Sequence, residues 1–132
     1  LWHGCGMSGC YLLDTHALLW ATGTPAKLSK EARKRLEEES ARILVSHATI
    51  WEMSIKWTIG KIKLPDGYFE SLENNGFEIM PMTDAHFSAY RALPLLHRDP
   101  FDRMLVAQAQ SEDLPLLSAD AKILAYDVNV VW

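Results

Sequence analysis

With 132 residues, of which 48% are hydrophobic and 23% charged, the chain has the composition of one ordinary globular domain and is too short for two cores. No apolar run approaches the roughly 20 residues that a transmembrane helix needs, so we predict no membrane association. The net charge of −4 lacks the basic excess typical of nucleic-acid-binding proteins. A nucleic-acid substrate would therefore require positive charge from bound cations.

The first residues are rich in glycine, and we predict a flexible leader or an expression remnant over residues 1–9, with Met7 as a biological start. A single folded domain is expected over residues 10–132. The leader carries neither the basic nor the apolar region of a secretory signal. Its cysteines, Cys5 and Cys10, are too few for a disulfide framework, which favours a reducing, cytoplasmic location. With His3 they would offer zinc only three ligands.

The first half of the chain alternates short apolar runs with helical patterns. The apolar run at 10–13 predicts a buried strand that ends at Asp14. Ser29 and Ser46 suit helix N-caps, and Gly60 is well placed to end a helix. In chain order we expect a strand over 10–13, a helix around 17–20, a polar helix over 30–39, a strand over 43–45 and a helix over 48–59.

Turn and cap signals organise the second half. Thr83 or Asp84 can cap one helix, while Asp99 can cap another that Pro100 opens. In chain order we expect a helix over 66–75, a strand over 77–80, a helix ending near 92, a long helix to about 112, a strand over 114–118, a helical turn over 120–125 and a strand over 128–132. Strands alternating with helices predict right-handed βαβ units. The predicted fold is α/β, a three-layer α/β/α sandwich around a parallel sheet of four to five strands.

Four acidic residues stand where such a fold would gather them. Asp14 ends the first strand, and Glu52 lies early in the helix after the second strand. Asp102 lies in the first turn of the long helix, and Asp120 follows the strand after it. Strand carboxyl ends and the starts of the following helices meet at one edge of a parallel sheet. We therefore expect the four carboxylates to converge there.

Each acid also has an ordinary structural interpretation. Asp14 and Asp120 can cap short helices, and the helix dipole favours Asp102 in a first turn. Glu52 can pair with Lys56 one turn along its helix. Buried together, however, carboxylates repel one another unless a cation neutralises them. Oxygen ligands without histidine or thiolate favour Mg²⁺ or Mn²⁺ over zinc, and such a site can position water and stabilise a phosphodiester undergoing displacement.

Four segments resemble the signature blocks of PIN domains, and more narrowly those of the VapC toxins of type II toxin–antitoxin systems. They are YLLDTHALLW (11–20), SHATIWEMSIKWTIGKIKL (46–64), HRDPFDRMLVAQAQ (97–110) and LPLLSAD (114–120). The resemblance covers the chain from about Tyr11 onward, in the family's order. It implies a PIN-like fold, Mg²⁺- or Mn²⁺-dependent endoribonuclease activity on an RNA substrate, a cognate VapB-like antitoxin and a homodimer.

The resemblance also implies roles for single residues. The family's acids match Asp14, Glu52, Asp102 and Asp120, with Asp14 and Asp102 as principal metal ligands. Asp120 stands in a Ser-Ala-Asp context where the family usually has Thr-x-Asp, a departure that retains a hydroxyl. Thr15 matches the hydroxyl residue beside the first acid, which can bond a carboxylate or a substrate phosphate.

Two arginines within the block HRDPFDRMLVAQAQ (97–110), which is the most specific of the four, are Arg98 and Arg103. Both are candidates for holding the RNA backbone, although both also suit a solvated helix end. Three tryptophans, Trp20, Trp51 and Trp57, are expected in the core. Any of them that is exposed would suit an antitoxin groove or a dimer seam.

Other protein classes fit less well. A haloacid-dehalogenase-like phosphatase needs Asp-x-Asp after its first strand, whereas Thr15-His16 follow Asp14. A receiver-like domain needs two adjacent early acids and a lysine on a late strand, and neither is evident in this sequence. The remaining alternative is a non-catalytic PIN-like module that binds RNA or protein, which would have no reason to keep all four acids.

Overall fold

The computed structural model describes residues 2, 5 and 9–132, arranged around one parallel sheet. The sheet has five strands in the order β3-β2-β1-β4-β5, as the α/β prediction expected. The strands are β1 (Cys10–Leu13), β2 (Arg42–Ser46), β3 (Phe77–Met80), β4 (Leu116–Leu117) and β5 (Val130–Val131). All four β1 residues are buried, because a central parallel strand is covered on both faces.

The helices begin mostly where the sequence offers capping side chains. They are α1 (Thr15–Gly23), α2 (Lys30–Glu37), α3 (His47–Thr58), α4 (Tyr68–Asn74), α5 (Asp84–Ala92) and α6 (Pro100–Glu112), with the 3₁₀ turns η1 (Pro25–Lys27) and η2 (Ile123–Ala125). Ser29, Ser46, Thr83 and Asp99 each accept a hydrogen bond from a backbone N–H of the first turn, which confirms these predicted caps. No described helix is long and apolar enough to cross a bilayer.

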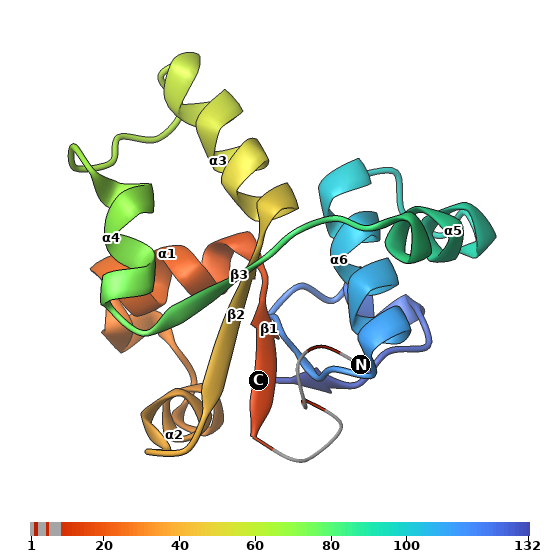
Figure 1. Cartoon of the computed structure of the whole chain (residues 1–132), viewed down its shortest axis with the longest axis horizontal. Helices are drawn as coiled ribbons and strands as arrows, with labels where there is room; N and C mark the ends of the chain where they lie inside the picture. The colour runs from red at the N-terminus through yellow and green to blue at the C-terminus, as the bar shows by residue number, and fades with distance from the viewer. Residues whose placement is uncertain (1, 3–4, 6–8) are drawn as a thin grey trace.

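Alternating side chains of the central strands divide the core into two layers. Tyr11 and Leu13 pack on one face with residues of α1, α2 and α4, whereas Leu12 packs on the other with residues of α6. Figure 1 shows α1, α2 and α4 on one side of the sheet and α5 and α6 on the other. This arrangement confirms the predicted three-layer α/β/α sandwich.

The two cysteines depart from the sequence expectation. Cys5 and Cys10 form a disulfide, and both lie in the core layer beneath α6. Their Cα atoms are 5.6 Å apart, within the range that one bridge spans. The pairing removes both thiols from the zinc site considered with His3, which, like Met7, lies outside the described residues. The cysteines therefore no longer favour a reducing compartment.

Candidate metal centre

Asp14 and Asp120 follow adjacent strands, β1 and β4, at the carboxyl edge of the sheet. Asp14 is 5% exposed, and its Oδ1 accepts a 2.8 Å hydrogen bond from the N–H of Ala17, so it caps α1. Burial raises the pKa of Asp14; hydrogen bonds from Ser118 and Ala17 oppose the rise, and the charge of Asp120 adds to it. Asp120 Oδ1 accepts a 2.9 Å bond from the N–H of Lys122. Asp14 therefore caps α1 and Asp120 holds a local turn, and a carboxylate retains further acceptor capacity beyond one such bond.

Glu52 lies on the buried face of α3, which starts where β2 ends. Its Oε1 accepts a 2.5 Å hydrogen bond from the hydroxyl of Thr15, and its Oε2 lies 3.1 Å from the ammonium of Lys56. The Thr15 bond connects α3 to the start of α1, next to Asp14. The anticipated ion pair within α3 is thus present, and it neutralises one carboxylate of the group.

Asp102 lies in the first turn of α6 but does not cap it. That role belongs to Asp99, as predicted, because its Oδ1 accepts bonds of 2.8 and 3.0 Å from two backbone N–H groups of the turn. Asp102 Oδ2 instead lies 2.9 Å from His97 Nε2. Burial raises the pKa of Asp102 to about 6, against the lowering effect of the His97 hydrogen bond. The nearby charges of Asp99, Glu52 and Asp120 add to the rise.

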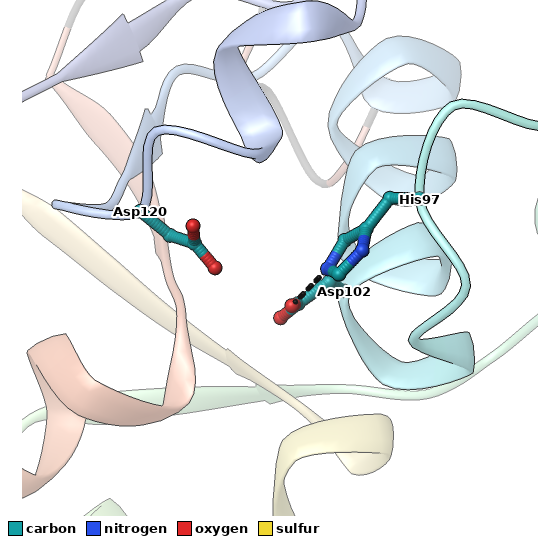
Figure 2. Close-up of side chains that lie close together, drawn as sticks. All are labelled: His97, Asp102 and Asp120. Carbon is teal, nitrogen blue, oxygen red and sulfur yellow. Dashed lines mark hydrogen bonds and ion pairs between the residues drawn. The ribbon is translucent and has the colours of Figure 1, made fainter.

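The structure brings the four predicted carboxylates to one edge of the sheet. The charge of Asp120 acts on both Asp14 and Asp102, and the charge of Glu52 acts on Asp102. Ligand atoms of His97, Asp102 and Asp120 all lie within 4.8 Å of one another. In Figure 2 the Asp120 carboxylate, from the loop after β4, points toward the joined His97 and Asp102 side chains.

One side chain close to the acids, His97, was not singled out from the sequence. The residue stands in the signature block as the first letter of HRDPFDR, five positions before Asp102. It lies in the loop between α5 and α6 and not on a helix face, so no periodicity marks it. Its distance from Asp102 depends on how that loop folds back over the start of α6.

The chemistry of these side chains suits a divalent cation. Asp14 and Glu52 are nearly buried, and Asp102 and Asp120 are half-buried, so their negative charges lie in a poorly solvated region. Among the ion pairs of residues 2, 5 and 9–132, Lys56 is the single lysine or arginine that contacts any of the four. A divalent cation would supply the missing positive charge, and carboxylate oxygens with an imidazole nitrogen are common ligands.

The arginines that the sequence proposed for RNA binding differ in placement. Arg98 is exposed and directly follows His97 in the chain. Arg103 is 5% exposed, and its guanidinium donates to the carbonyl oxygen of Pro94 at 2.9 Å and to the hydroxyl of Tyr126 at 3.1 Å. It also stacks over the ring of Tyr90, 4.9 Å from the ring centre. This placement contradicts the prediction for Arg103, because a buried guanidinium with protein partners does not reach a backbone phosphate.

The sequence profile described as the PIN domain matches residues 11–129. A comparison with curated proteins found no significant match.

Several solved structures share the fold at low sequence identity. A chain of VapBC2 from Rickettsia felis, solved bound to a DNA fragment from its promoter, is 16% identical with a TM-score of 0.71, over 92% of this chain and 97% of that chain. A chain of a toxin–antitoxin complex from Klebsiella pneumoniae is 20% identical with a TM-score of 0.64, over 92% and 96%. FitAcB from Neisseria gonorrhoeae is 19% identical with a TM-score of 0.64, again over 92% and 96%.

Proposed function

The chain belongs to the PIN domain family, and on that premise we propose that it is a metal-dependent endoribonuclease that acts as the toxin of a type II toxin–antitoxin pair. The observation that carries the proposal is the meeting of Asp14, Glu52, Asp102 and Asp120 at one edge of the sheet, with raised pKa values at Asp14 and Asp102. The antitoxin part is supported by folds shared with proteins solved as toxin–antitoxin complexes.

In this proposal Asp14, Asp102 and Asp120 hold Mg²⁺ or Mn²⁺, and Glu52 completes the group directly or through water. When bound, the cation would polarise water and stabilise charge on the phosphodiester as the 3′-oxygen leaves. Thr15 fixes the orientation of Glu52 through its hydroxyl, and Lys56 fixes it from the other oxygen. Arg98, which is exposed and directly follows His97 in the chain, is the candidate contact for the RNA backbone.

The acid spacing favours a catalytic site over a binding module without activity. The helix starts in this region are already capped by one oxygen each, since Asp99 Oδ1 caps α6 and Asp14 Oδ1 caps α1. Neither cap requires Asp102 or Asp120 to lie near another carboxylate. Placing like charges together lowers stability unless a ligand compensates, so the arrangement is most simply explained by a bound cation.

Expression of the chain alone in a bacterial host should arrest growth and fragment cellular RNA, because no antitoxin is present to cover the site. Co-expression of the small reading frame beside its gene should restore growth. Colony counts and an RNA gel measure both effects. Normal growth despite accumulation of folded protein would argue against the toxin assignment.

An exposed apolar stripe on α3 supports a protein partner. Trp51 and Ile55 are 58% and 40% exposed, and Ile59, just past the end of the helix, is 60% exposed. The expectation of a core position for Trp51 was wrong, because this residue lies on the face of α3 opposite the buried Met53. The Trp51 ring packs edge-on against Phe101 of α6. We assign the stripe to a homodimer, since pairing with the same stripe of a second copy would remove these apolar side chains from water.

Substituting Ile59→Asp should convert this dimer to a monomer, because a charge in an apolar interface is desolvated without a partner. Sedimentation equilibrium at micromolar concentration measures the change. Leu124→Asp is the matched control, since Leu124 is 63% exposed and lies on η2, away from the stripe. A wild-type protein that is monomeric at these concentrations would exclude the dimer.

A further inference from the structure

Contacts to both its side chain and its backbone hold His97 in place. Its side chain is 12% exposed, and its Nε2 lies 2.9 Å from Asp102 Oδ2. Its backbone N–H donates a 2.9 Å hydrogen bond to the hydroxyl of Tyr126. The buried guanidinium of Arg103 donates to the same hydroxyl and to the carbonyl oxygen of Pro94 in the same loop. Hydrogen bonds to Tyr126 and from Arg103 therefore both hold the loop that carries His97.

This support is not needed for the local structure of α6. Asp99 already caps the helix, and Pro100 starts it without an N–H to satisfy. The Arg103 and Tyr126 contacts hold the backbone of His97, while its ring extends toward Asp102 and Asp120 in Figure 2. The arrangement consequently orients an imidazole nitrogen toward the carboxylates.

The distances match those of ligands that share one cation. Metal–ligand bonds of about 2.1 Å at right angles separate neighbouring donor atoms by about 3.0 Å. His97 Nε2 and Asp102 Oδ2 are 2.9 Å apart, and one ligand atom each of His97, Asp102 and Asp120 lies within 4.8 Å of the other two. Small side-chain rotations would bring all three atoms onto one ion.

On the basis of the proposed nuclease site, we propose that His97 is a nitrogen ligand of its cation. Imidazole binds first-row transition ions well, whereas Mg²⁺ prefers oxygen ligands and retains water. The site should therefore bind Mn²⁺ more tightly than Mg²⁺, and His97 should account for much of the difference. Arg103 and Tyr126 then act as positioning residues for this ligand.

Pulsed electron paramagnetic resonance of the full chain with Mn²⁺ alone tests the proposal. The wild-type protein should show coupling from a directly bound ¹⁴N nucleus, and ¹⁵N-labelling of histidine should replace it with ¹⁵N coupling. His97→Gln should remove the coupling and weaken Mn²⁺ binding by about tenfold or more, with a smaller effect on Mg²⁺. His47→Gln, at an exposed histidine of α3, should change neither.

The possible failures are distinguishable. Mn²⁺ that binds in an Asp102-dependent manner without nitrogen coupling would overturn the His97 assignment and leave the proposed nuclease site intact. Coupling that persists in His97→Gln would also overturn it. A protein that binds no Mn²⁺ at millimolar concentration would overturn both proposals. Even if the His97 variant folds poorly, the isotope-labelled wild type shows whether any histidine nitrogen binds Mn²⁺, and its absence would overturn the His97 assignment.

Discussion

Substituting Asp14→Asn is expected to lower the rate of RNA cleavage by about 10³-fold or more. The amide keeps the size of the side chain and one acceptor oxygen, so it can still accept the 2.8 Å bond from Ala17 that caps α1. It lacks the negative charge that a divalent cation requires. Loss of one charged ligand removes several kcal/mol of transition-state stabilisation, which corresponds to a rate effect of this size.

Cleavage of a fluorescent RNA by purified protein in Mn²⁺ measures this rate. Asp84→Asn is the matched control, because Asp84 is an exposed acid in the first turn of α5, away from the other carboxylates. The control should cleave at the wild-type rate. Undiminished cleavage by folded Asp14→Asn would remove Asp14 from the proposed ligands.

Saturating Mn²⁺ is expected to raise the melting temperature of the wild-type protein by about 10 °C. A cation at 100 times its dissociation constant stabilises the folded state by about 2.7 kcal/mol, which corresponds to a shift of this order for a domain of this size. Asp102→Asn should abolish most of the shift. Differential scanning fluorimetry measures both, and Asp84→Asn again serves as the control. A melting temperature independent of Mn²⁺ in the wild type would exclude a preformed site.

In the metal-free protein, Asp102→Asn should change the free energy of unfolding in a manner that depends on pH. Because the folded-state pKa of Asp102 is raised to about 6, above its ordinary value of 3.8, the folded state binds more protons between these pH values. This contribution to stability is present below pH 4 and is lost as pH rises through about 6. The difference in free energy of unfolding between wild type and Asp102→Asn should therefore change by about 3 kcal/mol over this range. A difference that does not vary with pH would mean that Asp102 ionises normally.

The fold was predictable because its signals are local. The apolar run of β1 ends at Asp14, and the caps Ser29, Ser46 and Asp99 stand directly before their helices, so each element could be located from a few neighbouring residues. Convergence of the four acids followed from topology, since strand ends and helix starts share one edge. β4, with its two residues, is shorter than its apolar run suggested.

The rest depended on contacts between distant parts of the chain. His97 reaches Asp102 only after its loop closes, and the buried position of Arg103 requires Tyr126, 23 residues later. In the sequence alone, an arginine in the first turn of a helix is typical of a solvated end. Trp51 is exposed because α3 runs outward from the sheet (Figure 1), which residue type alone does not indicate.

A crystal soaked in Mn²⁺ and measured at the manganese absorption edge addresses the shared cation directly. We expect an anomalous peak between Asp102 and Asp120, within ligand distance of Asp14 or one water away. The same peak should vanish in Asp102→Asn crystals. Saturating Mn²⁺ with no peak at these residues, or a peak elsewhere on the surface, would contradict the idea that these side chains gather around a metal.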